Sequence, residues 1–182
     1  DVYLERNDPR EILISKSNLN FYELKNKSII GTSSFRREAQ IKQLRKDLIT
    51  KLIRGNVDTR IKKLKENEYD AIVLAFAGVK MLKKEEKISQ VFSIEEILPS
   101  VGQGIIAIQS RKNDHKINNI IKKTNHKETY LCAVAEREML KVLGGDCETA
   151  VAGLAVIENN KIFLNCELFS IDGKKKFAFS IY

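Results

Sequence analysis

The chain has 182 residues, of which 43% are hydrophobic and 31% are charged, and its formal net charge is +8. The length suits one large domain or two small ones, and apolar runs such as residues 71–77 are far too short to cross a bilayer. Three cysteines without CxxC spacing, together with two histidines, argue against a zinc site and against a disulfide framework, so a reducing compartment is the default expectation.

The first half of the chain alternates strand-like apolar runs with helical segments. Residues 12–14, 28–31, 48–53 and 69–77 predict strands, and residues 35–45, 60–66 and 79–87 predict helices. Thr32-Ser33-Ser34 supplies the cap chemistry for the first of these helices. This alternation predicts βαβ units and a mainly parallel sheet covered on both faces.

The second half begins with a crossing marked by Pro99 and by the glycines at 102 and 104. Residues 105–108 predict a strand, residues 117–121 a short helix and residues 128–143 a longer amphipathic helix. Residues 151–156, 161–169 and 176–181 then predict antiparallel strands joined by tight turns. We expect an α/β domain, a connector and a partial α+β domain.

Cys147 lies in Leu143-Gly144-Gly145-Asp146-Cys147, just after the longer helix. Two glycines predict a helix stop and a turn that presents the thiol on a loop, where a reactant can reach it. The alternative is a small buried apolar residue, which is the commonest fate of a free cysteine. Cys132 and Cys166 lie within a helix and a strand, and we expect both to belong to the core.

A first candidate site is Gly31-Thr32-Ser33-Ser34-Phe35-Arg36-Arg37. A strand end, a turn of small residues and a helix N-terminus place free backbone N–H groups together, and this arrangement favours anions. Two arginines in the first helical turn oppose the helix dipole, which indicates that an anion is bound there. The alternative is an ordinary helix cap with two solvated arginines.

A second candidate site is Arg54-Gly55-Asn56-Val57-Asp58-Thr59-Arg60, again at a strand end that leads into a helix. The ends of parallel strands meet at one crevice, so Arg54 and Arg60 could join Arg36 and Arg37 there. Four arginines indicate a ligand with several carboxylates or phosphates. Neither run is a dinucleotide or Walker motif, so nucleotide binding is not favoured.

These two runs, with Tyr69-Asp70-Ala71-Ile72-Val73-Leu74-Ala75, Leu98-Pro99-Ser100-Val101-Gly102-Gln103-Gly104, Glu136-Arg137 and the Cys147 loop, resemble the porphobilinogen deaminase (hydroxymethylbilane synthase) family. They occur in the family's order and spacing over nearly the whole chain. The resemblance implies a periplasmic-binding-protein-like (type II) domain in residues 1–98, a crossing segment in residues 99–124 and a partial third domain in residues 125–182.

The resemblance also implies an activity and its ligands. The family condenses four porphobilinogen molecules, with loss of ammonia, into hydroxymethylbilane on a dipyrromethane cofactor, which is attached to a cysteine matching Cys147. The positions that match the family's carboxylate-binding residues are Thr32, Ser34, Arg36, Arg37, Arg54 and Arg60, and Gln103 lies on a matching interdomain crossing. The implied partners are porphobilinogen and oligopyrrole polycarboxylates, without nucleic acid or membrane, and the complete protein is expected to be a monomer.

The sequence departs from the family pattern in four ways. Asp146 stands where a small residue is usual, Ala150 where a proline is usual, and Met81 where another carboxylate-binding arginine is usual. The fourth departure is that the N-terminal domain, with the family's catalytic aspartate, and the end of the third domain have no counterpart here. We therefore expect the isolated chain to lack deaminase activity. The compartment stays open, with the cytoplasm or a plastid as the expected locations.

Two other functions stay open. A non-catalytic anion-binding module of periplasmic-binding-protein fold explains the arginines but not the Gly-Gly-Asp-Cys loop. A nucleic-acid binder is suggested by net charge alone, because the lysine runs are typical of a solvated face and no aromatic interleaving or known motif is present. If Arg36 binds a ligand carboxylate, its replacement is expected to weaken binding while changing fold stability little.

Overall fold

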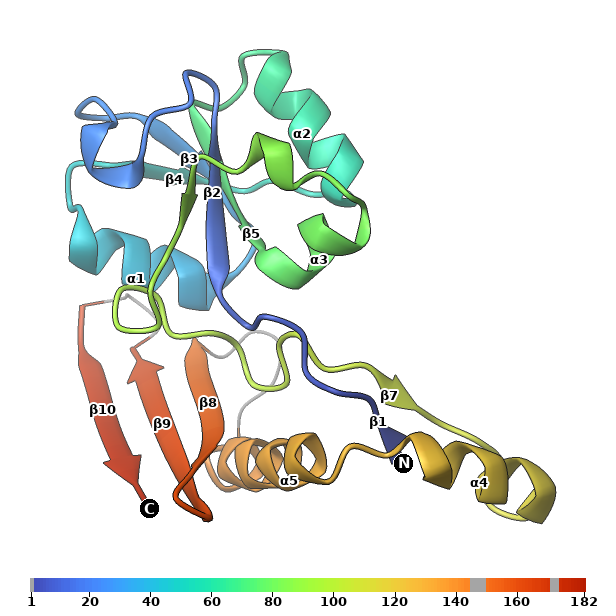
Figure 1. The fold of residues 1–182 in the computed structure, drawn as a ribbon. Helices are drawn as coiled ribbons and strands as arrows, with labels where there is room; N and C mark the ends of the chain where they lie inside the picture. The colour runs from blue at the N-terminus through green and yellow to red at the C-terminus, as the bar shows by residue number, and fades with distance from the viewer. Residues whose placement is uncertain (1, 145–149, 171–173) are drawn as a thin grey trace.

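The computed structural model describes residues 2–144, 150–170 and 174–182, and these residues form three separate sheets (Figure 1). The strands are β1 (Val2–Tyr3), β2 (Glu11–Ser15), β3 (Ile29–Gly31), β4 (Ile49–Lys51), β5 (Ala71–Ala75), β6 (Gln90–Val91), β7 (Ala107–Ile108), β8 (Val151–Glu158), β9 (Lys161–Phe169) and β10 (Lys176–Ile181). The α-helices are α1 (Phe35–Leu44), α2 (Val57–Lys65), α3 (Phe76–Met81), α4 (His115–Ile121) and α5 (Lys127–Val142), and short 3-10 helices lie at Phe21–Glu23, Glu85–Lys87 and Lys122–Thr124. No helix in this part of the chain is long and apolar enough to span a membrane.

The largest sheet has five strands in the order β4-β3-β5-β2-β6. Strand β3 is parallel to β4 and β5, whereas β2 is antiparallel to both β5 and β6. The expected mainly parallel sheet is therefore wrong, and the sheet is mixed. The reason lies in where the chain enters: β2 begins at Glu11, which pairs with Ala75 at the end of β5, so β2 starts at the edge where the parallel strands end.

Helices cover both faces of this sheet, as the strand-helix alternation predicts. Alternate residues of each strand point to opposite faces, so Leu13 and Val73 pack on the side of α1 while Ile12 and Ile72 pack on the side of α2 and α3. All four side chains are fully buried. The α/β architecture of the first half of the chain is confirmed.

Several predicted elements have different limits; α2, for example, begins at Val57 rather than at residue 60. The paired register of β5 with β2 ends at Ala75 opposite Glu11, and although the Phe76 N–H still donates to the Arg10 carbonyl (3.0 Å), α3 begins at Phe76, within the run expected to be strand, and ends at Met81 rather than at Lys87. The strand expected at residues 105–108 is reduced to β7, because β1 pairs only with these two residues.

The last part of the chain forms a three-stranded antiparallel sheet in the order β10-β9-β8, which confirms the three predicted strands. Helix α5 packs against one face, where Met139 contacts Val151 and Cys166. A Cβ at Gly153 of β8 would lie 2.5 Å from Cε of Met139, so a glycine lets the helix approach the sheet closely. The other face packs against Leu98, and at the end of the sheet where β8 begins and β9 ends Phe169 contacts Ala39 of α1 (Figure 1).

The segment before β2 and the segment before β7 run side by side between the two domains (Figure 1). The Asn7 N–H donates to the Gly104 carbonyl (2.9 Å), and the Gln103 side chain donates to the Pro9 carbonyl (2.6 Å). Gly104 has φ +80°, and a Cβ there would lie 2.5 Å from the Asn7 oxygen. Glycine is thus required at this position by both backbone conformation and space.

Candidate anion-binding site

The candidate site lies at the edge of the five-stranded sheet where β3 and β5 end and β2 begins. Helix α1 starts four residues after the end of β3, and the Ser34 hydroxyl caps it by accepting from the Arg37 N–H (3.4 Å). Buried Thr32 supports the same turn, because its hydroxyl accepts from the Ser34 N–H (3.2 Å). The expected strand-turn-helix arrangement and its cap are confirmed.

Arg36 is buried and already has protein partners. Its Nη2 donates to Oε1 of Glu11 (2.6 Å), and its Nη1 donates to the Leu98 carbonyl (2.8 Å). The Gln40 side chain bonds Leu98 as well, accepting from its N–H (2.7 Å) and donating to its carbonyl (3.1 Å). Arg36 therefore joins α1 to the start of β2 and to Leu98, directly before the crossing segment.

Arg37 is held less completely. Its Nη2 lies 2.8 Å from Oε2 of Glu11, an ion pair without hydrogen-bond geometry, and its Nη1 donates to the Val73 carbonyl (3.2 Å). Its Nε is buried and has no hydrogen-bond acceptor. Oε2 of Glu11 likewise lacks a hydrogen-bond partner, so the polar groups of this pair are not fully matched, although 11% of the Arg37 side chain stays exposed.

Arg60, from α2, approaches the same place. Its Nε donates to the Gly55 carbonyl (2.8 Å), and its Nη2 donates to the Ser33 hydroxyl (3.3 Å). Burial first, and the positive charge of Arg37 second, lower the pKa of Arg60 below its ordinary value. The positive charges of Arg37 and Arg60 repel each other, and an anion bound beside them would relieve that repulsion.

Arg54 lies at the other end of the turn that precedes α2. Its side chain is exposed, and its carbonyl accepts from Lys63 (3.3 Å). The turn depends on Gly55, which has φ +120° and leaves no room for a Cβ, since that atom would lie 2.7 Å from Cβ of Thr59. The structure thus groups Thr32, Ser34, Arg36, Arg37 and Arg60 at one edge, and it places Arg54 on the adjoining surface.

Glu11 is the residue of this cluster that the sequence analysis missed. It is completely buried, and both Arg36 and Arg37 contact it. Burial alone would raise its pKa, but the charges of Arg37 and Arg36 outweigh burial and hold the pKa below the ordinary value of 4.5. The available signal was an acidic residue directly before an apolar strand run, which is an unusual place for a carboxylate without a cationic partner.

The described cysteines are both core residues. Cys132 in α5 and Cys166 in β9 are buried, as expected. Burial raises the pKa of both thiols above the ordinary value, that of Cys166 to about 11, so neither is a good nucleophile at neutral pH. Cys147 and Asp146 lie outside the described residues.

Two other positions that depart from the family pattern, Ala150 and Met81, lie in described parts of the chain. Ala150 is buried against Ala39 and Phe169, and Met81, at the end of α3, is largely exposed. Among the residues that the structure describes, no group of three or more His, Cys, Asp or Glu side chains could hold a metal ion.

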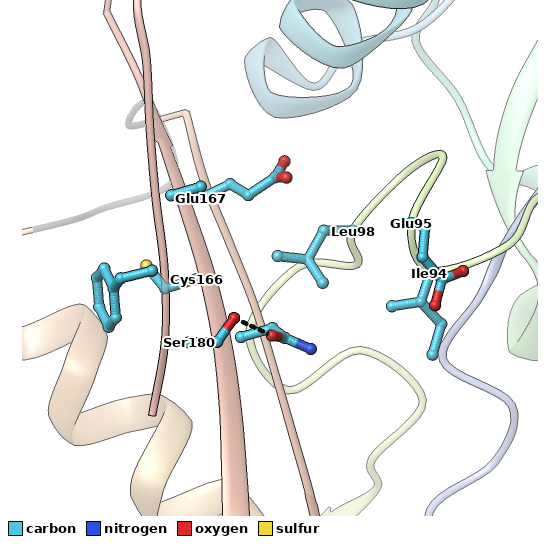
Figure 2. Close-up of a pocket in the computed structure, with 9 residues that line it drawn as sticks. Ile94, Glu95, Leu98, Cys166, Glu167 and Ser180 are labelled. Atoms are coloured by element: carbon cyan, nitrogen blue, oxygen red, sulfur yellow. Dashed lines mark hydrogen bonds between the residues drawn. The ribbon is translucent and has the colours of Figure 1, made fainter. Parts of the chain in front are cut away.

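A small cavity of about 160 Å³ lies between β9, β10 and the segment that contains Ile94 and Leu98 (Figure 2). Glu167 points from β9 toward α1 in Figure 2, and its charge acts on Arg36. The cavity adjoins Arg36, which donates to the carbonyl of the cavity-lining residue Leu98.

Comparison with known proteins identifies the family. The model "Porphobilinogen deaminase, dipyromethane cofactor binding domain" matches residues 1–119, and "Porphobilinogen deaminase, C-terminal domain" matches residues 130–182. Porphobilinogen deaminase of Syntrophomonas wolfei is 43% identical over 175 residues, which cover 96% of this chain and 57% of that protein. The Coxiella burnetii enzyme is 43% identical over 173 residues, which cover 95% of this chain and 56% of that protein.

The chain thus spans somewhat more than half the length of the relatives it matches. A solved structure of a Salmonella typhimurium periplasmic binding protein with high arginine specificity overlaps 73% of this chain and 59% of its own, with a TM-score of 0.40 and 15% identity. The two family models together cover both the arginine-bearing domain and the antiparallel sheet. This chain belongs to the porphobilinogen deaminase family.

Proposed function

We propose that this chain carries the pyrrole-carboxylate site and the cofactor cysteine of a porphobilinogen deaminase, which builds hydroxymethylbilane from porphobilinogen. In this proposal, residues 1–98 are the periplasmic-binding-protein-like domain, residues 99–124 the crossing segment and residues 125–182 part of the cofactor-bearing domain. The ligands are porphobilinogen and its oligopyrrole products, and each pyrrole carries an acetate and a propionate.

The observation that carries the proposal is the approach of Arg60 to Arg37, which keeps 11% of its side chain exposed. A carboxylate placed beside them would be attracted by both guanidiniums and would relieve the repulsion between them. The capped N-terminus of α1 adds positive potential at the same edge. These donors suit a carboxylate and leave no need for a metal.

The same residues fit the dipyrromethane cofactor, whose side chains are also carboxylates. When bound, the cofactor supplies the primer to which further pyrroles are joined. Within this chain, Arg37, Arg60, Thr32, Ser34 and Arg54 would hold and orient its carboxylates, and Arg36 would fix the backbone beside them. Positioning of this kind lowers the entropic cost of each addition.

Intact-mass measurement tests the cofactor assignment. Chain purified from a host that makes tetrapyrroles is expected to carry a covalent pyrrole adduct, and the Cys147→Ser variant is expected to carry none, because a hydroxyl is a far weaker nucleophile than a thiolate. Cys132→Ser and Cys166→Ser serve as matched controls and should keep the adduct. Peptide mapping of the adduct to Cys132 or Cys166 would overturn the assignment.

The same measurement separates the proposal from its alternative. A chain that binds porphobilinogen through its arginines but carries no adduct under any expression condition would be a non-catalytic anion-binding module. Acid treatment that releases pyrroles should restore the unmodified mass if the adduct is a pyrrole. An adduct that survives this treatment argues for a different modification.

A further inference from the structure

We propose that Glu11 is the positioning residue of the anion site, an inference that rests on the proposed function. Glu11 touches no ligand group in this proposal. It acts through Arg36 and Arg37, by fixing where their guanidiniums point.

The geometry carries the argument. One carboxylate divides its two oxygens between two arginines: Oε1 lies 2.6 Å from Nη2 of Arg36, and Oε2 lies 2.8 Å from Nη2 of Arg37. Both arginine side chains are nearly buried and Glu11 is completely so, which means that water cannot take over its role. Like charges so close together would repel strongly in such surroundings without the carboxylate.

The backbone explains how Glu11 reaches both arginines. Because β2 is antiparallel to β5, Glu11 stands opposite Ala75 at the edge where α1 also begins. With Nη2 of Arg37 facing Glu11 and Nη1 bonded to the Val73 carbonyl, the guanidinium has a fixed orientation, and only 11% of the side chain remains exposed to a ligand. Glu11 thereby fixes which part of Arg37 a carboxylate meets.

A purely electrostatic role and a positioning role of Glu11 predict opposite changes in porphobilinogen affinity for the Glu11→Gln substitution. Glu11→Gln removes a negative charge beside two arginines, so charge alone would tighten the binding of porphobilinogen, which carries two carboxylates. If Glu11 positions the arginines, the same change weakens binding, because Arg36 and Arg37 repel each other and turn away. We expect the Kd for porphobilinogen to rise about tenfold or more, the usual loss for a misplaced charge-assisted hydrogen bond.

Calorimetric titration of the full 182-residue chain with porphobilinogen tests this prediction. Glu38→Gln is the matched control, since it changes the net charge equally from the same helix as the arginines but pairs with Lys42 and Thr50. Its affinity should equal or slightly exceed that of the unmodified chain. Glu11→Asp keeps the charge on a shorter side chain and should recover part of the affinity that Glu11→Gln loses.

The outcomes separate the inference from the proposed function. If Arg37→Gln weakens binding while Glu11→Gln binds as tightly as Glu38→Gln, the positioning role is wrong and the site stands. If Arg37→Gln and Arg60→Gln also leave the Kd unchanged, the site itself is wrong, and the inference falls with it.

Should Glu11→Gln fail to fold, the unmodified chain still provides a test by NMR of the arginine side chains. Slow rotation of the Arg37 guanidinium, with an Nε–H signal that moves on addition of porphobilinogen, supports the inference. A freely rotating Arg37 guanidinium overturns it.

Discussion

Arg6 and Glu136 form a buried ion pair across 130 residues of sequence, with Nη1 of Arg6 2.5 Å from Oε1 of Glu136 and Nη2 3.3 Å from Oε2. Glu136 has no solvent exposure and also accepts from the N–H groups of Gly102 (2.6 Å) and Ala155 (2.8 Å). One carboxylate of α5 thus joins the segment before β2, the crossing segment and β8. Each remaining acceptor direction of the carboxylate is used by the backbone, so its burial is compensated.

Arg6→Ala should therefore destabilise the chain strongly. It leaves the Glu136 carboxylate buried without its cation, and breaking such a pair from one side costs roughly 3–5 kcal/mol of unfolding free energy. Urea denaturation followed by circular dichroism measures the loss. Arg10→Ala is the matched control, because among the described residues the Arg10 side chain pairs with neighbouring Asp8 near the surface, and its loss should cost about 0.5 kcal/mol or less. Equal midpoints for the two variants would refute the prediction.

Arg36→Ala should also reduce stability, in contrast to the expectation from sequence that the fold would change little. Its guanidinium is buried and serves Glu11 and the Leu98 carbonyl, so its removal leaves Glu11 paired with Arg37 alone. We expect a loss of roughly 1.5–3 kcal/mol, because Arg37 still compensates part of the Glu11 charge. Arg54→Ala removes an exposed arginine from the adjoining surface and should leave the urea midpoint nearly unchanged. A stable Arg36→Ala variant would show that the Glu11 pair contributes little.

Acid should act on the fold partly through Glu11. Its pKa in the folded chain lies below the ordinary value of 4.5, so its contribution to stability is complete above about pH 4.5 and is lost as pH falls through the folded pKa. Glu11→Gln should remove this part of the acid dependence and make the curve of stability against pH flatter below pH 4.5. Glu5→Gln, which removes an exposed carboxylate, should retain the slope of the unmodified chain. An identical slope in Glu11→Gln would contradict the prediction.

The described thiols should resist alkylation. With the pKa of Cys166 raised to about 11 by burial, roughly one molecule in a thousand carries this thiolate at pH 8, and Cys132 is buried as well. Iodoacetamide at pH 8, followed by mass spectrometry of peptides, should leave both cysteines unmodified in the native chain. It should modify both in about 8 M urea, which unfolds most small domains. Rapid native labelling of either cysteine would mean that its part of the core opens readily.

The elements that the sequence predicted well are those with strong local signals. Helix α5 and strands β8, β9 and β10 follow from periodicity and from the turns between them, and α1 follows from the Ser34 cap. The start of α3 could not be read from the apolar run 69–77, because the run stays apolar through Phe76 and Ala77, where the helix has already begun. The direction of β2 depends on the crossing segments and has no local signature.

In the candidate site, too, the sequence predicted the features with local signals and missed those that depend on distant residues. The sequence grouped Arg36, Arg37 and Arg60 at one edge, since strand ends and helix starts are local features, but it also placed there Arg54, which is exposed on the adjoining surface. It did not predict that Arg36 is buried, because Glu11 lies 25 residues earlier on a strand whose direction was not known. It also did not predict which arginine keeps an unmatched N–H, which depends on the Val73 carbonyl of yet another strand.

The bonds at Leu98 restrict how the two domains can turn relative to each other. Leu98 is tied to α1 through Arg36 and Gln40, and Gly102 is tied to α5 through Glu136. Between them, Pro99 has a ring-fixed φ, and its carbonyl accepts from Gly153 of β8 (2.9 Å). Pro99 and Gly102 are thus both tied to the domain of α5 and β8, together with Val101, which packs against Met139 and Val151, whereas Leu98 is tied to α1. In this segment, a rotation that breaks none of these bonds must therefore be absorbed at the junction of Leu98 and Pro99.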